Sequence, residues 1–105
     1  MENIIGALVS LAPHTRIAHH QPGRIRLKFF PSILQLVDGR EIETLVGSIP
    51  GILEYRLNPL AKSTVINYDQ QRLPYEVWVL LGQTHVRPEL GSELAARLRS
   101  LWVVH

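Results

Sequence analysis

An alternation of apolar and basic residues over residues 24–29 constrains the fold more than any other feature of the sequence. The apolar members are Ile25, Leu27 and Phe29, and the basic ones are Arg24, Arg26 and Lys28. Successive side chains of a strand point to opposite faces, so the pattern predicts one face toward a core and one toward solvent or an anionic partner. The chain is therefore expected to build a sheet that is covered on one side.

A second β-prone segment, residues 15–18, precedes this strand, and His-His-Gln-Pro-Gly at residues 19–23 separates the two. Pro22 cannot donate a hydrogen bond to a strand ladder, and Gly23 tolerates a positive φ. We expect residues 15–30 to form one long strand that a bulge or tight bend interrupts at this point.

Spacing, caps and breakers predict the remaining elements. They are a helix over residues 3–12, a linker over 31–39, a helix from 40 to about 49, a hairpin of strands 52–57 and 63–68, a helix that ends near Gly82, and a helix over about 88–103. The core strand, helix, strand, strand and helix are five of the six elements of a ferredoxin-like βαββαβ unit, an α+β fold.

The sixth element, a fourth strand, is short or missing. Either residues 84–87 supply it or one sheet edge stays open, and an open edge invites pairing with a second copy. We therefore expect a homo-oligomer or a docked partner. The 105 residues make one domain, with its core over about residues 15–82 and a helical segment at each end.

The composition excludes several classes of function. There is no cysteine, which removes disulfides, thiolate catalysis and iron–sulfur clusters. The formal net charge is only +2, so the large basic excess of many nucleic-acid-binding proteins is missing. The apolar run at residues 4–12 is too short to span a bilayer and lacks the basic flank of a secretory signal. We expect a cytoplasmic protein, whose membrane association, if any, is through a partner.

Three segments carry a resemblance to a known family. They are His-x-x-Pro-Gly-Arg-x-Arg at residues 19–26, Ile-Pro-Gly-Ile-Leu-Glu-Tyr-Arg-Leu-Asn-Pro-Leu at 49–60, and Ser-Thr-Val-Ile-Asn-Tyr-Asp at 63–69. Together they resemble the cysteine-less branch of heavy-metal-associated domains, which are similar to amino-terminal modules of heavy-metal-transporting P-type ATPases and to small proteins encoded beside them. The resemblance covers about residues 15–82.

The resemblance implies a role in transition-metal homeostasis, with iron as one candidate, and a partner such as a metal-transporting P-type ATPase or another membrane protein. In the better-known members a Cys-x-x-Cys loop between the first strand and first helix binds soft cations. Here that interval, residues 29–34, holds neither thiol nor imidazole. The resemblance therefore implies the scaffold and not the thiolate site.

Three histidines remain as candidate ligands for a transition-metal ion or haem: His14, His19 and His20. Adjacent residues of a strand point to opposite faces, so His19 and His20 do not easily share one ion. His14 and His20 would lie about 20 Å apart on an extended strand. Any site would therefore need two chains, each giving one histidine; otherwise the histidines are simply exposed or hydrogen-bonded.

The basic trio Arg24, Arg26 and Lys28 has three interpretations: a solvated face, a docking surface for an acidic partner, or contacts to phosphate or anionic lipid. Like charges on one face repel, so we expect an acid such as Glu54 or Asp69 across from them. No aromatic residues are interleaved to stack bases, so RNA is not the expected partner.

No nucleophile elbow, glycine-rich phosphate loop or spaced carboxylate pair is present, so we expect no enzyme. The favoured function is an accessory or regulatory module of a transition-metal handling or transport system that acts by protein contact. Two alternatives stay open. One is a direct metal or haem binder that uses His19 and His20 at a dimer interface, and the other is a structural or membrane-associated assembly protein built through the apolar chain ends.

Overall fold

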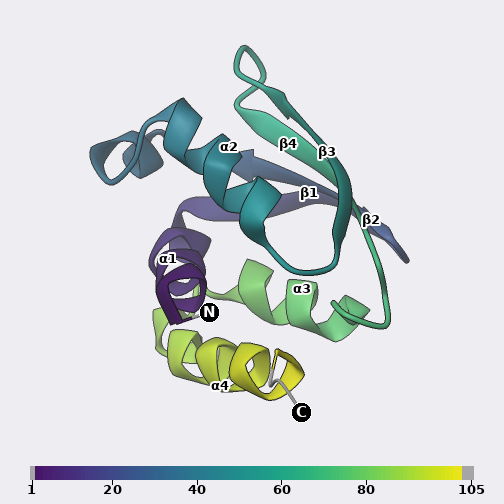
Figure 1. The fold of residues 1–105 in the computed structure, drawn as a ribbon. Coiled ribbons are helices and arrows are strands. Elements are labelled where there is room, and N and C mark those ends of the chain that lie inside the picture. Colours follow the sequence, from purple (N-terminus) through teal and green to yellow (C-terminus); the bar gives the residue numbers. More distant parts are fainter. Residues whose placement is uncertain (1, 103–105) are drawn as a thin grey trace.

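The computed structural model describes residues 2–102 as a sheet of four strands with four α-helices (Figure 1). The strands are β1 (Thr15–Gln21), β2 (Arg24–Phe29), β3 (Ile52–Asn58) and β4 (Ser63–Tyr68). The helices are α1 (Glu2–Leu11), α2 (Gly39–Ser48), α3 (Tyr75–Gln83) and α4 (Gly91–Leu101), with short 3-10 turns at Ala12–His14, Pro31–Gln35 and Pro88–Leu90. The α+β class is therefore confirmed.

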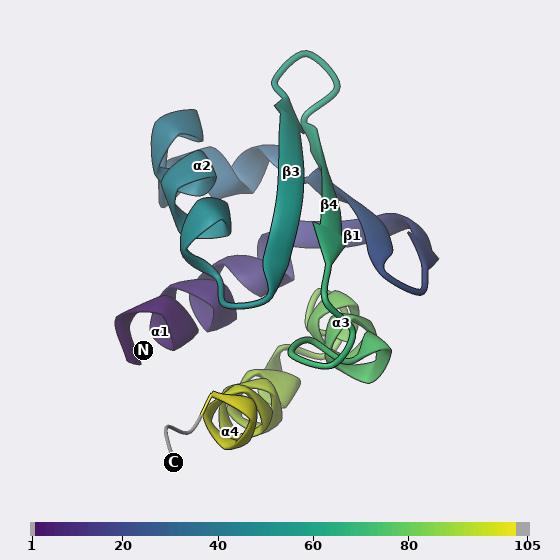
Figure 2. The same ribbon diagram turned by 45° about the vertical axis from the view of Figure 1, so that its right-hand side comes forward.

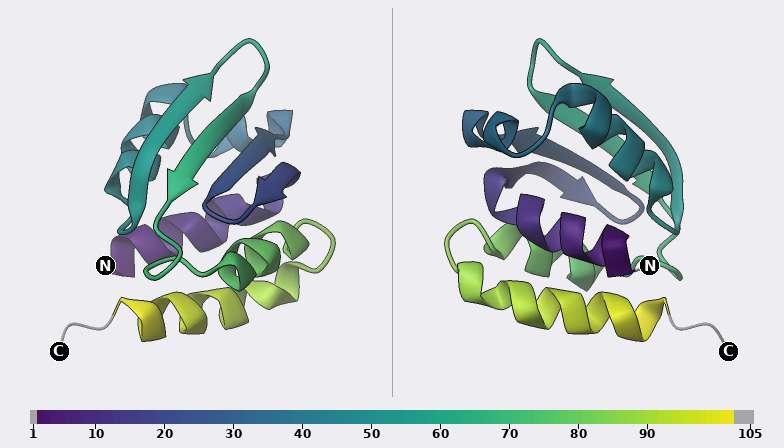
Figure 3. Two further views of the ribbon diagram at one scale, coloured as in Figure 1. Left: turned by 90° about the vertical axis from the view of Figure 1, so that its right-hand side faces the viewer. Right: turned by 60° about the vertical axis from the view of Figure 1, so that its left-hand side comes forward.

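All strand pairs are antiparallel, and the strand order is β1-β2-β4-β3. Figure 3 shows the sheet from two sides, with the strands toward the viewer in one panel and α1 and α2 in front of them in the other. The helices thus gather on one side of the sheet, and the other face stays open. This is the one-sided arrangement that the alternation in β2 predicts.

The expectation of one long interrupted strand was wrong, because residues 15–29 fold back as the β1–β2 hairpin. Gln21 pairs with Arg24, which leaves Pro22 and Gly23 as a two-residue loop. Gly23 has a φ of 83°, and proline before a positive-φ glycine is the arrangement of a type II turn. The bulge that we expected at the break lies instead inside β1, between Ile17 and His19.

The fourth strand is present, but residues 84–87 do not form it. They form the turn after α3, whereas β1 occupies the edge position beside β2. β1 and β3 are consequently the two edge strands of the sheet. The predicted hairpin of residues 52–57 and 63–68 is confirmed as β3 and β4.

Local signals explain where the helices begin. Asp38 caps α2 with a complete capping box, in which its carboxylate accepts the amide proton of Glu41 at 2.8 Å. Pro74 stands directly before α3. The predicted helix over 3–12 is confirmed as α1, and the predicted carboxy-terminal helix is confirmed as far as Leu101; its last predicted residue, Val103, lies outside the described residues.

The helix α4 packs on α1 and α3 and lies away from the sheet as an outer layer (Figure 2). Glu2 and Arg99 form an ion pair at 3.0 Å that joins the first turn of α1 to the last turn of α4. An exposed pair of this kind contributes little to stability, so the packing of the helices must hold the layer in place.

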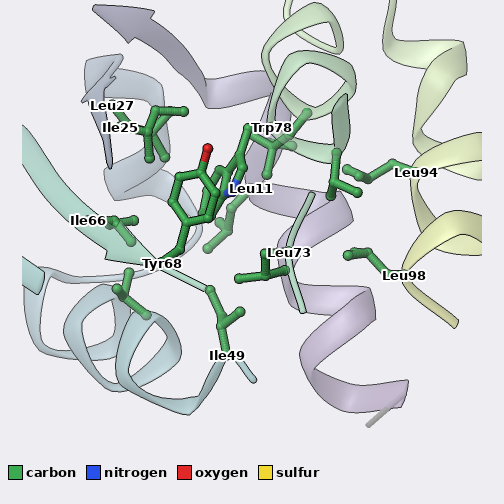
Figure 4. Close-up of a cluster of buried hydrophobic side chains, with 14 of the residues drawn as sticks. Leu11, Ile25, Leu27, Ile49, Ile66, Tyr68, Leu73, Trp78, Leu94 and Leu98 are labelled. Carbon is green, nitrogen blue, oxygen red and sulfur yellow. The ribbon is translucent and has the colours of Figure 1, made fainter. Parts of the chain in front are cut away.

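Side chains from the sheet and the helices meet in one core (Figure 4). Ile25 and Ile66, paired across β2 and β4, are almost fully buried, and Trp78 of α3 packs its ring against Tyr68 at 5.1 Å. Leu94 and Leu98 extend this core into α4. Trp78 and Trp102 are both buried in this core.

Candidate functional site

The open face of the sheet carries a cluster of basic side chains on three of its four strands. The pairing puts Arg16 beside Lys28, Arg26 in the same row as Arg56, and Arg24 in the same row as Glu54. We call this surface the basic face; its cations are Arg16, Arg24, Arg26, Lys28 and Arg56. The sequence pattern identified the β2 trio but not Arg16 and Arg56, because strand pairing brings these two onto the same face.

A furrow of about 530 Å³ runs over β4 within this face. Its floor consists of the short side chains Ser63, Val65 and Asn67. Arg24 and Arg26 stand on the β2 side, and Arg56 stands on the β3 side with Glu54, the single acid that residues 2–102 contribute to the lining. Because small residues on the central strand lie between longer residues on its neighbours, the face is concave along its length.

None of the basic-face cations forms an ion pair within residues 2–102. The ion pairs of this part of the chain are Arg87–Glu89, Arg97–Glu76 and Arg99–Glu2, all remote from the furrow. The expected acidic neighbours do not neutralise the face. Glu54 does lie on it, but β4 separates its strand from that of Arg24, which places the two strands about 9 to 10 Å apart. Asp69 instead caps a turn by accepting the Gln71 amide proton at 2.9 Å.

His19 and His20 lie on opposite faces of β1, as the sequence predicts for adjacent strand residues. His19 is exposed and pairs with Arg26 on the basic face, whereas His20 pairs with Ile25 on the covered face. The bulge at Ala18 produces this placement, because without it Ile17 and His19 would share a face. The two imidazoles therefore do not converge within one chain.

His20 is held by two tyrosines. Its Nε2 atom lies 2.7 Å from the Tyr68 hydroxyl, with which it shares a hydrogen bond, and its ring stacks on Tyr75 at a centroid distance of 3.7 Å. Burial lowers the pKa of His20, and the nearby His19 lowers it further. Burial raises the pKa of Tyr68. His20 is thus a neutral, engaged side chain near neutral pH and not an open ligand.

The third predicted ligand, His14, lies at the other end of β1. Its Nδ1 atom shares a hydrogen bond of 2.7 Å with the Ser32 hydroxyl, whereas His20 pairs with Ile25 near the hairpin loop. Within residues 2–102, no three histidine or carboxylate side chains gather in a way that could hold a metal ion. The same residues include no helix that is both long and apolar enough to cross a membrane.

A second hollow, which the sequence analysis missed, opens at the end of the sheet next to the β3–β4 loop. It is an apolar pocket of about 230 Å³ between that loop, the chain after β2 and the start of α2. We call it the end pocket; its lining is Phe29, Phe30, Pro31, Ile33, Leu34, Gly39, Ile42, Leu57, Asn58, Pro59 and Lys62. Residues 29–34, the segment that holds neither thiol nor imidazole, contribute much of this lining. This segment therefore presents an apolar surface.

Comparison with protein-family models, with curated proteins and with solved structures finds no match to this chain. The site must therefore be interpreted from its own geometry. The main geometric facts are a concave basic face without internal ion pairs, an engaged His20, and an apolar pocket beside the end of the furrow.

Proposed function

We propose that this protein is a non-enzymatic binding module that acts by protein contact, and that its basic face holds an acidic segment of a partner protein. The observation that carries the proposal is the furrow over β4, where Arg24, Arg26 and Arg56 stand without an ion-pair partner among residues 2–102. Complementary charge attracts an acidic partner and orients it on the surface.

The chemistry of the face favours protein over nucleic acid or lipid. The open-face positions of β2, β3 and β4 carry no aromatic ring on which bases could stack. Tyr55 of β3 borders the furrow, but its hydroxyl end lies toward α2, 3.0 Å from where a Cβ atom at Gly47 would stand. The open-face positions of β2 and β4 carry no apolar side chain larger than Val65, whereas entry into a lipid layer needs larger ones.

The resemblance to heavy-metal-associated domains supplies the biological setting of the proposal. In that setting the protein is an accessory or regulatory module of a transition-metal transport system, and the acidic segment belongs to a P-type ATPase or another membrane protein. The strand order supports the same interpretation: β2, α2, β3, β4 and α3 follow one another as in a ferredoxin-like unit, with β1 at the edge where its last strand would lie.

Binding of a fluorescently labelled glutamate-rich peptide, followed by anisotropy, tests the proposal. We expect binding that weakens from low salt to about 0.15 M ionic strength. The double variant Arg24→Glu/Arg26→Glu should weaken it by about tenfold or more, since two contacts become repulsive. The matched control is Arg40→Glu/Arg72→Glu, which changes the net charge equally at exposed arginines outside the basic face.

Equal losses in the two double variants would contradict the proposal, because they would show a general charge effect. Tighter binding of a single-stranded oligonucleotide with the same number of charges would also contradict it, in favour of nucleic acid. Both variants should keep the wild-type circular dichroism spectrum, which separates lost binding from lost folding.

The alternative of direct metal or haem binding has its own test. Titration with iron, zinc, copper(II), nickel and haem, with light-scattering mass measured alongside, should give no stoichiometric uptake that depends on His19 and His20. Uptake of one ion or haem per two chains, lost in His19→Ala/His20→Ala, would favour the dimeric binder. Such a site would have to release His20 from Tyr68 and Tyr75.

A further inference from the structure

The end pocket and the furrow of the basic face meet at the β3–β4 loop. Asn58 lines both hollows, and the loop residues Ala61 and Lys62 line the furrow and the pocket respectively. A chain that lies in the furrow and continues past this loop therefore reaches the mouth of the pocket. Lys28, Ser63 and Asn58 lie side by side on β2, β4 and β3, and they are the part of the basic face nearest to the end pocket.

The end pocket has the character of a site for an apolar side chain. Its walls are almost wholly carbon, and at about 230 Å³ it is smaller than the usual range of about 300 to 1,000 Å³ for small-molecule sites. Large apolar side chains stand exposed around it: Leu34 is 61% exposed and Leu60, in the adjoining loop, is 98% exposed. Exposed apolar side chains grouped beside an apolar hollow are one of the features of binding surfaces.

From this geometry we infer that the end pocket holds an apolar anchor, a leucine or phenylalanine side chain, that adjoins the acidic run of the partner segment. This inference rests on the proposed function, because it takes the acidic run in the furrow as its starting point. The charge around the pocket suits an anchor that adjoins an acidic run, because Lys62 borders the pocket and no acidic residue is among its lining. The anchor would give affinity by burial, and the acidic run would give orientation.

Gly39 offers a way to close the pocket without disturbing the fold. It lines the pocket at the start of α2, and a Cβ atom there would meet nothing within 4 Å. Gly39→Leu therefore adds a large apolar side chain at a residue that lines the pocket, without a backbone clash. Gly6→Leu in α1 is the matched control, because a Cβ atom at Gly6 also meets nothing within 4 Å and Gly6 lies outside the pocket.

The experiment compares three labelled peptides by anisotropy: a glutamate run alone, and the same run with phenylalanine added through one glycine at either end. We expect one extended peptide to bind about tenfold tighter than the plain run, as burial of one large apolar side chain provides. Gly39→Leu should remove this gain and leave the plain run unaffected, whereas Gly6→Leu should change neither. Leu34→Ala should reduce the gain in part.

The inference is overturned if neither extended peptide binds more tightly, or if the gain survives Gly39→Leu. It is also overturned if light scattering finds a dimer that dissociates in both Leu60→Ser and Gly39→Leu, because the pocket would then hold the loop of a second copy. Failure of the proposed function gives a different result. In that case Arg24→Glu/Arg26→Glu leaves the binding of all three peptides unchanged.

Discussion

The two faces of β2 share one backbone and differ in what each side chain does for the molecule. Ile25 and Leu27 are buried against the helices, whereas Arg24 and Arg26 are exposed and have no ion-pair partner among residues 2–102. The covered face accounts for folding. Folding does not require a concentration of like charge on the other face, since repulsion there opposes the compact state. This difference between the two faces is the basis of our proposal that the basic face binds a partner.

The largest effect on stability should come from truncating a side chain on the covered face, compared with truncating one on the open face. We expect Ile25→Ala to lower the free energy of unfolding by about 3 kcal/mol, because it leaves a cavity in a fully buried site. Arg26→Ala, one position along the same strand, should change it by at most about 0.5 kcal/mol. Urea denaturation followed by circular dichroism measures both. A cost for Arg26→Ala similar to that of Ile25→Ala would mean that the basic face also holds the fold.

A smaller loss of stability should follow when a methyl group is added at the contact between β1 and α3. A Cβ atom at Gly82 would lie 2.5 Å from Cδ1 and 2.9 Å from Cγ1 of Ile17. We expect Gly82→Ala to cost about 1 kcal/mol, since the clash outweighs the gain in helix propensity. When Ile17→Ala is also present, the clash is removed, so the cost of Gly82→Ala should fall by about 1 kcal/mol. A double-mutant cycle measured by urea denaturation tests this. Simple additivity of the two costs would show that β1 does not pack on α3 here.

The smallest effect concerns His20, the one histidine of β1 that faces the covered side. Its pKa is lowered by burial and by His19, so the unfolded chain takes up the proton first as the pH falls. The resulting stability is fully present above the ordinary pKa of 6.5 and is lost as the pH falls from 6.5 to the lowered value. The groups around the imidazole are His19, Tyr68 and Tyr75.

Chemical denaturation of the wild type and of His20→Gln, at pH values on both sides of 6.5, measures this effect. Tryptophan fluorescence, to which Trp78 beside Tyr68 and the buried Trp102 both contribute, can report the unfolding. We expect the wild type to lose more stability on acidification than the variant does. If the free energy of unfolding depended on pH identically in the wild type and in the variant, His20 would have the same pKa in the folded and unfolded chain.

Local patterns predicted the parts of the fold that local physics determines. The helical spacing of Ile42 and Val46 and the alternation of Ile25 and Leu27 both correspond to buried positions. The β1–β2 hairpin was missed because the Pro22–Gly23 pair permits either a bend within a strand or a reversal between two strands. Pairing with a distant strand decides between them: β4 takes one side of β2, which leaves the other side for β1.

The candidate site was predictable in its charge but not in its shape. Arg24, Arg26 and Lys28 were visible as a pattern, whereas Arg56 joins them only through the register of β3 and β4. The partner of His20 is Tyr68, 48 residues away in the sequence. The end pocket depends on how three separate segments meet, so no sequence spacing indicates it.

The contact between Glu2 and Arg99 has a consequence for how the chain can be reconnected. The first turn of α1 and the last turn of α4 are adjacent, so the fold suits circular permutation. If the segment from α1 to β1 were moved behind α4 through a short linker, the new chain would begin at β2 and end with β1. Its edge strand would then come last in the sequence while every contact of the sheet stayed the same. We therefore expect the permuted chain to fold, with β1 in the same place in the sheet and a different place in the sequence.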